Sequence, residues 1–338
     1  MDANPRNTTA WITPPMWAAF IVFGTLPMWI EPVGLYQYLG LEVLVWIIFA
    51  LGFNLLLGYT GLPSFGHGAF LGIGAYAFGL AQFELWANLW FCLLAAVAAS
   101  ACLGGLTALF LAHRRGIYFA LMTIAFGQIY FFIASKWTTV TGGEDGLLNI
   151  RRLPVELGFT SLDIADNRAL YYLVFGCFVV TTIAAWRLVN SPFGRILRAI
   201  KQNETRVAYI GYRVRLFKWA AFTLSCAYAG LAGALFAMAQ EGAYIQVMSL
   251  QWSGVIVLMV LIGGGFVSFW GPVVGVVFYF VLRDVLGAYT QTWLLWFGLA
   301  FMAAVMFKPD GLAGMWQDAA AWLRRVRERG AAAPPAGR

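Results

Sequence analysis

The amino-acid sequence predicts an all-α polytopic membrane protein with about ten transmembrane helices and with short amphipathic helices in one cytoplasmic loop. Its residues are 61% hydrophobic and 11% charged, whereas a soluble domain is about 25% charged. Stretches such as 43–83 and 242–282 contain no Asp, Glu, Lys or Arg. A helix needs about 20 apolar residues to cross a bilayer, so each of these stretches must hold more than one crossing.

Glycines, prolines and charges divide the apolar stretches into ten predicted spans. Unpaired backbone amides are so costly in hydrocarbon that each span must be helical. The segment 66–83 is rich in glycine and open to a re-entrant interpretation, although the parity of the later spans favours a full crossing. The spans are 15–31, 37–58, 66–83, 88–112, 116–135, 169–187, 217–240, 253–269, 271–288 and 290–307.

Basic residues predict that both termini are cytoplasmic. In that orientation 17 of the 22 Lys and Arg lie in inner segments, while ten of the 15 acidic residues lie outside, as the positive-inside rule requires. The net charge of +7 then reflects orientation and attraction to anionic membrane lipid, and requires no nucleic acid. The predicted segments are a cytoplasmic N-terminus 1–14, a transmembrane region 15–308 and a cytoplasmic tail 309–338. The transmembrane region includes a periplasmic loop 136–168 and a cytoplasmic loop 188–216.

The segment 54–76, NLLLGYTGLPSFGHGAFLGIGAY, carries six glycines and a proline between apolar flanks. Tight helix packing explains any single glycine, since Gly68 and Gly72 form a GxxxG pair. Transporters also place substrate sites at helices interrupted by Gly or Pro. The run as a whole therefore favours a broken helix beside a polar path. The polar side chains on that path are Asn54, Tyr59, Ser64 and His67.

The loop 191–218 predicts two short amphipathic helices at the cytoplasmic face. Ser191 is placed to cap the first helix, with Pro192 at its first position. Asn203 is placed to cap a second helix that ends at Gly211. Two interpretations stay open, because basic amphipathic helices lie on lipid and also dock into grooves of soluble partners.

The outer loop 136–168 begins with TGGEDGL, residues 141–147. Loops this long are usually functional or disordered, so both a docking turn for an extracytoplasmic partner and a solvated connection remain open. Glu144 and Asp145 lack the alternating oxygen ligands of a calcium loop. The four cysteines lie within predicted spans without CxxC spacing, and we therefore predict no metal site.

The absence of several motifs limits the functions that the chain could perform by itself. The sequence has no GxxxxGK[ST], so any ATP hydrolysis must come from another subunit. It has no acidic residue in the middle of a predicted span, which weakens a stand-alone secondary carrier or channel. There is no HExxH, and Ser64 and His67 have no evident third partner, which weakens a membrane enzyme.

Four blocks, in order, resemble the permeases of branched-chain amino-acid ABC importers, in particular the longer of the two paired permease subunits. They are the glycine-rich block 54–76; RRGIYFALMTIAFGQ, 114–128, followed by VTGGEDGL; SPFGRILRAIKQNE, 191–204; and VLIGGGFVSFWGPVVG, 260–275, with FKPDGLAG. The resemblance begins near Leu39. Arg206 and Val207 stand where relatives commonly carry two alanines.

This resemblance implies an inner-membrane permease that does no bond chemistry and needs partners. These would be a second permease, two cytoplasmic ATPases holding ATP-Mg, and a periplasmic solute-binding protein, with no cofactor in this chain. Branched-chain or other hydrophobic amino acids are the implied substrates, while urea, amides and small aromatic acids remain alternatives among close relatives.

Three residue sets follow from the resemblance together with the segments above. Contact with the ATPases is assigned to Ser191, Pro192, Gly194, Arg195, Arg198, Ala199, Ile200, Glu204 and Gly211. The substrate pathway is assigned to Asn54, Tyr59, Gly61, Ser64, His67 and Gln128. Docking of the binding protein is assigned to Thr141, Gly142, Gly143, Glu144, Asp145 and Gly146.

Overall fold

The computed structural model of the protein describes residues 14–30, 36–156, 161–162, 164, 166–266, 268–290, 292–307 and 311–315. The chain divides into two compact units, residues 1–257 and residues 258–338. The segments predicted as cytoplasmic termini, 1–14 and 309–338, lie almost wholly outside the described residues.

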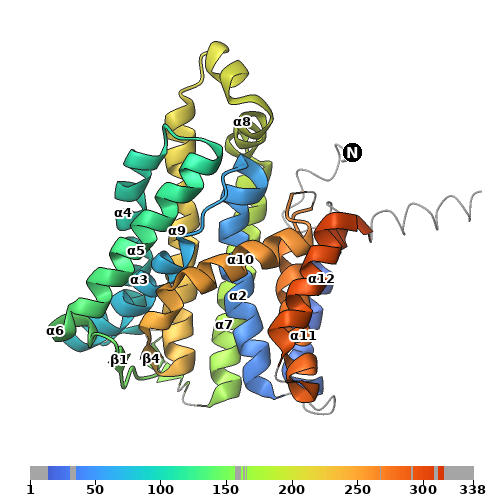
Figure 1. Cartoon of the computed structure of the whole chain (residues 1–338). Helices are drawn as coiled ribbons and strands as arrows, with labels where there is room; N and C mark the ends of the chain where they lie inside the picture. The colour runs from blue at the N-terminus through green and yellow to red at the C-terminus, as the bar shows by residue number, and fades with distance from the viewer. Residues whose placement is uncertain are drawn as a thin grey trace, which may run out of the picture. The chain divides into compact units, whose positions relative to one another are not determined.

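The first unit is a helical bundle (Figure 1). Its helices are α1 (Pro14–Trp29), α2 (Gln37–Asn54), η2 (Leu55–Thr60), α3 (His67–Leu80), η3 (Ala81–Leu85), α4 (Leu89–Leu111), α5 (Gly116–Lys136), α6 (Thr138–Thr141), α7 (Asn167–Asn190), α8 (Pro192–Tyr209), α9 (Val214–Gln240) and η4 (Ile245–Met248). The helix α10 (Leu250–Gly263) begins in this unit.

Helix α9 forms the centre of the first unit, where it packs against α2, α3 and α4. Small residues allow the close approach, as expected where no hydrophobic force drives helices together in lipid. A Cβ atom on Gly233 would lie 1.9 Å from the Leu71 carbonyl oxygen, and one on Gly74 would lie 2.3 Å from the Gly230 carbonyl oxygen. The contact is therefore backbone against backbone.

Seven helices in the described part of the chain are long and apolar enough to cross a membrane. They coincide with seven of the ten predicted spans, including the glycine-rich one, which is His67–Leu85. The other three predicted spans coincide with shorter apolar helices, Pro14–Met28, Leu250–Gly263 and Leu294–Ala303. The polytopic helical fold is confirmed, and the count of ten crossings remains a prediction.

Two helix boundaries differ from the sequence prediction for local reasons. The span predicted at 253–269 begins earlier, at Leu250, and ends at Gly263, because Gly264 adopts a φ of +82° in the left-handed region that ends helices. The span predicted at 37–58 ends in the π-helical turns of η2. Gly61, with φ +74°, stops that segment.

In the first unit, α8 and the α4–α5 corner lie at one end, which we call the α8 end. At the opposite end β1 (Leu147–Leu148) pairs antiparallel with β4 (Gly242–Ala243), and β2 (Val155–Glu156) pairs with β3 (Ser161–Leu162). Figure 1 shows α8 at the top and β1 and β4 at the bottom. The all-α class predicted from the sequence agrees with this mostly helical structure, in which two short two-residue strand pairings accompany the helices at this end.

The second unit consists of the end of α10, α11 (Gly271–Tyr289), α12 (Trp293–Phe307) and a helical turn at 311–315. Glycines bring α10 and α11 together. A Cβ atom on Gly275 would lie 1.8 Å from the Met259 carbonyl oxygen, and one on Gly263 would lie 1.9 Å from the Gly271 carbonyl oxygen. The glycine-rich block 260–275 therefore forms a tight contact between the two helices.

Candidate functional site

The two amphipathic helices predicted in the inner loop are present as the two halves of α8. The Ser191 hydroxyl accepts a hydrogen bond from the Gly194 amide at 3.4 Å. Within α8, Asn203 leaves helical geometry at φ −160° and ψ 97°, and its Oδ1 accepts a hydrogen bond from the Arg206 amide at 3.0 Å. The second half ends before Gly211, whose φ is +99°. The helix caps at Ser191 and Asn203, and the end of the helix before Gly211, agree with the sequence prediction.

An apolar face holds α8 against the start of α9. Leu197, Ile200 and Val207 are buried in one cluster with Val214 and Ala221. Phe193 stacks on Phe217 beside this cluster, with ring centroids 5.7 Å apart. The inward face of α8 is therefore occupied by its own chain, and only the outward face is left for a partner.

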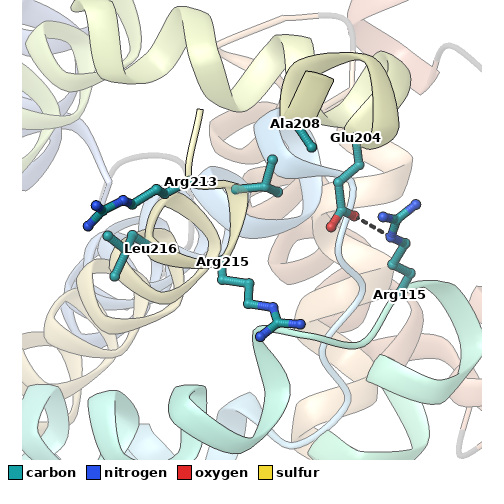
Figure 2. Close-up of a pocket in the computed structure, with 7 residues that line it drawn as sticks. Arg115, Glu204, Ala208, Arg213, Arg215 and Leu216 are labelled. Atoms are coloured by element: carbon teal, nitrogen blue, oxygen red, sulfur yellow. Dashed lines mark ion pairs between the residues drawn. The ribbon is translucent and has the colours of Figure 1, made fainter. Parts of the chain in front are cut away.

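An ion cluster reinforces this apolar contact, and Figure 2 shows its Arg115–Glu204 pair. Glu204 Oε2 lies 2.8 Å from Arg115 Nε, and Glu204 Oε1 lies 3.5 Å from Lys218 Nζ. The Lys218 side chain is only 1% exposed, and its ammonium also donates to the Arg114 carbonyl oxygen. A buried charge left without a counter-ion is strongly unfavourable. Glu204 therefore clamps α8 to the α4–α5 corner and to α9 together.

Lys201 ties α8 to the end of the interrupted helix. Its Nζ donates a hydrogen bond to the Gly58 carbonyl oxygen at 2.8 Å. A Cβ atom on Gly61 would lie 3.0 Å from Lys201 Cγ, so the two segments touch. Burial lowers the pKa of the Lys201 ammonium group from its ordinary value, because desolvation disfavours the charged form.

The structure divides the residues assigned to ATPase contact between two faces. Arg198, although exposed, donates to the Val189 and Gly194 carbonyl oxygens. The exposed members are Pro192, Arg195, Arg198 and Gly211; the buried or partly buried members are Ser191, Gly194, Ala199, Ile200 and Glu204.

Sequence reasoning missed Arg115 and Lys218, the two cations of the clamp, and Lys201, which ties α8 to Gly58. The sequence does contain one indication that Glu204 pairs with a cation. Glu204 is the single acidic residue between Arg187 and Lys218, and an isolated acid among so many cations is placed to neutralise one of them.

The interruption predicted in the glycine-rich segment is present between η2 and α3, and buried polar contacts hold it in place. His67 is wholly buried. Its Nδ1 lies 3.2 Å from Ser64 Oγ, and its Nε2 lies 2.8 Å from Ser225 Oγ on α9. The Phe65 amide donates to Thr123 Oγ1 at 3.0 Å, and the Gly68 amide donates to Ser253 Oγ at 2.9 Å. The segment is thereby linked to α5, α9 and α10.

The residues assigned to the substrate pathway occupy several environments. Asn54 is 1% exposed, and its Oδ1 has no hydrogen-bond partner among the described residues. Gly61 lines a 330 Å³ cavity together with Lys201 and Glu204. Ser64 and His67 contact each other, while Tyr59 packs against the α8 cluster. Gln128 is exposed on α5.

The residues assigned to docking of a binding protein form a tight turn at the end opposite α8. Gly142, Gly143 and Gly146 all have positive φ values. The Thr141 hydroxyl donates to the Ala134 carbonyl oxygen at 2.6 Å, and Glu144 and Asp145 are exposed. Because β1 pairs with β4 directly after this turn, the two acids project from a loop that is fixed at both ends.

The described residues hold no group of three or more His, Cys, Asp or Glu side chains that could bind a metal ion. The four cysteines are free, and Cys92 and Cys226 are buried. Their burial fits a packing role for small apolar side chains.

Comparison with known proteins identifies the family. Residues 37–308 match the family model described as branched-chain amino acid transport system / permease component. The chain is 30% identical over 292 residues to the high-affinity branched-chain amino acid transport system permease protein LivM of Escherichia coli (strain K12), covering 80% of this chain and 68% of that protein. The LivM protein of Salmonella typhimurium (strain LT2) gives the same identity and coverage.

The match to a more distant relative covers nearly the whole of that protein. The probable branched-chain amino acid transport permease protein LivM of Methanocaldococcus jannaschii is 23% identical over 322 residues, covering 80% of this chain and 92% of that protein. No solved structure matches the chain. The extent of the family match and the 30% identity show that the chain belongs to the branched-chain amino acid transport system permease family, as a multi-pass membrane subunit of an importer.

Proposed function

We propose that the chain forms one half of the membrane pathway of an ATP-driven importer for branched-chain or other hydrophobic amino acids. The substrate follows from the names of the relatives, LivM proteins of high-affinity branched-chain amino acid transport systems. The partners would be a second permease, two ATPases that bind ATP-Mg, and a periplasmic binding protein. This chain would carry no cofactor and catalyse no reaction, and in bacteria it would lie in the inner membrane.

The connection from α8 to the interrupted helix is the observation that carries this proposal. The outward face of α8 would dock on an ATPase, while its inward face is clamped by Glu204 and tied by Lys201 to the Gly58 carbonyl oxygen. ATP-driven movement of the ATPases would then reach the segment that bears Asn54 and Tyr59. Alternating access requires an element with two conformations whose populations depend on nucleotide binding. Helix α8 with its connection to the interrupted helix would be such an element.

Orientation completes the proposal. Helix α8, which carries Arg195 and Arg198, lies at the same end of the first unit as the α4–α5 corner, which carries Arg114 and Arg115. This basic end would face the cytoplasm. The turn at 141–146, with Glu144 and Asp145, would face the periplasm and meet the binding protein. Ten crossings and two cytoplasmic termini are the arrangement we propose, with the three shorter apolar helices completing the count.

Uptake by reconstituted vesicles tests the function. Vesicles that hold this chain alone should not accumulate leucine, and the addition of the second permease, the ATPases, the binding protein and ATP should start accumulation. Uptake by the lone chain under an ion gradient would instead establish a secondary carrier. Offering leucine, urea and benzoate to the complete complex separates the substrate classes, because only leucine should accumulate strongly.

A charge reversal tests the docking face of α8. Arg195 is exposed and lies outside the clamp, so Arg195→Glu should reduce co-purification of the ATPases while the chain stays folded. Arg168→Glu makes the same change at an exposed position in the first turn of α7, at the opposite end. It should leave the association unchanged. Equal ATPase recovery with both variants would refute the assignment of α8.

A further inference from the structure

Two cavities at the α8 end meet at the start of α9. The first has a volume of 560 Å³ and is lined by Arg115, Glu204, Ala208, Arg213, Val214, Arg215 and Leu216 (Figure 2). The second has a volume of 390 Å³ and is lined by Leu109, Ala112, His113, Arg215, Leu216 and Trp219. Arg215 and Leu216 belong to both, so a charged space and a largely apolar space adjoin.

The charged cavity carries excess positive charge. Three arginines line it and one carboxylate faces them, and that carboxylate, Glu204, is already bound to Arg115. Within the described part of the chain, neither Arg213 nor Arg215 forms an ion pair through its side chain. Figure 2 shows Arg215 extending toward the segment that precedes α5, while Arg213 points to the other side of the start of α9. Arg215 is therefore the cation best placed to hold an anion.

The apolar cavity continues onto a surface suited to lipid. Leu109 and Phe110 of α4 are 64% and 54% exposed, and Ile117 of α5 is 74% exposed. Since α4 ends at Leu111 and α5 begins at Gly116, the two cavities lie where membrane-spanning helices leave the hydrocarbon. Trp219, whose indole N–H donates to the Gly105 carbonyl oxygen at 2.8 Å, suits this interfacial level. In a bilayer this position would lie at the level of the lipid headgroups.

We propose that these cavities bind one anionic phospholipid, with its phosphate at Arg215 and an acyl chain along Leu109, Leu216 and Trp219. Arg213 adds positive charge near the headgroup. Basic pockets at the ends of membrane-spanning helices are known to suit anionic headgroups. An acidic protein surface would use only the charged cavity, whereas a phospholipid fills both compartments, and this favours lipid. The bound headgroup would lie beside the Arg115–Glu204 pair and so beside the clamp on α8.

Native mass spectrometry of the full-length chain in mild detergent tests this site. Phosphatidylglycerol should be retained in preference to phosphatidylcholine, and soluble glycerol phosphate should not displace it, because the acyl chain contributes binding. A charge near an anionic surface is worth about 1 kcal/mol, or roughly fivefold, and a charge-assisted hydrogen bond adds to that. Arg215→Gln should therefore lower the retention of phosphatidylglycerol about tenfold, and Arg213→Gln about fivefold.

Matched variants make the result decisive. Arg206→Gln removes the same charge from an exposed position of α8 that lines neither cavity and should leave retention unchanged. Arg215→Lys keeps the charge and should keep most of the binding, which shows that the protein is folded. Equal retention of the two lipids, or equal losses for Arg206→Gln and Arg215→Gln, would overturn the proposal. Loss of ATPase association by Arg215→Gln with unchanged lipid retention would also overturn it, in favour of a protein-docking patch.

Discussion

Neutralising Glu204 should release α8 from the bundle. Glu204→Gln keeps the shape of the side chain and an acceptor oxygen but removes the charge that faces Lys218, whose side chain is 1% exposed. Loss of one partner from a buried ion pair costs about 3–5 kcal/mol. Because the Glu204 side chain is 16% exposed, we expect the lower value, about 3 kcal/mol. The other half of the clamp involves Arg115, which is 58% exposed, and an exposed pair is worth up to about 1 kcal/mol.

Hydrogen exchange of the α8 amides measures how much each ion pair of Glu204 stabilises α8, because exchange reports local opening. Glu204→Gln should accelerate exchange in α8 on the order of 100-fold, whereas Arg115→Gln should accelerate it about fivefold or less. Exchange in α4 should change little in either variant. The double variant Glu204→Gln with Lys218→Met should recover much of the protection, since replacing both partners of a buried pair is often neutral. Equal effects of Glu204→Gln and Arg115→Gln, or no recovery in the double variant, would refute the clamp.

Three further predictions test packing, buried polarity and pH. Gly233→Ala places a Cβ atom 1.9 Å from a backbone oxygen of α3 and should lower thermal stability in detergent by about 1–3 kcal/mol or more; Gly176→Ala, which meets nothing within 4 Å, should not. Asn54→Leu removes a buried oxygen without a hydrogen-bond partner and should reduce leucine uptake without loss of stability, whereas Ser225→Ala breaks a 2.8 Å contact and should cost about 1–3 kcal/mol. Destabilisation of the protein by Asn54→Leu would contradict the assignment of Asn54 to the substrate pathway. Because burial lowers the pKa of Lys201 from 10.5, protection of α8 should rise with pH between the lowered value and 10.5, and Lys201→Met should abolish that rise.

Much of the architecture could be predicted because membrane burial leaves a strong imprint on sequence. The apolar stretches located the helices, and the caps at Ser191 and Asn203 follow from side chains that bond their own backbone. The end of α10 at Gly263 was missed because the three glycines 263–265 lie inside an apolar stretch that was interpreted as one continuous span, 253–269. The short strands β1 and β4 could not be predicted, since two-residue pairings depend on contacts remote in sequence.

The candidate site was only partly predictable for a related reason. Glu204 was recognised through its motif, but its binding to Lys218 depends on how α8 folds back across the start of α9. Periodicity identifies which face of a helix is apolar, and it carries no information on which buried cation an acid will meet. The burial of His67 likewise depends on α9, whose Ser225 lies far along the chain from the glycine-rich segment.

The widened turns of η2 have a mechanical consequence. A π-helical segment holds more residues per turn than an α-helix, and each residue of an α-helix accounts for about 100° of rotation. If Leu55–Thr60 returned to α-helical winding, the chain after η2 would rotate about the helix axis relative to α2. The accompanying shift along the axis would be small. Lys201 holds the carbonyl oxygen of Gly58 within that segment. A pull on α8 would thus reach Tyr59 and Asn54 as torsion, which can turn a side chain toward or away from a solute without opening the bundle.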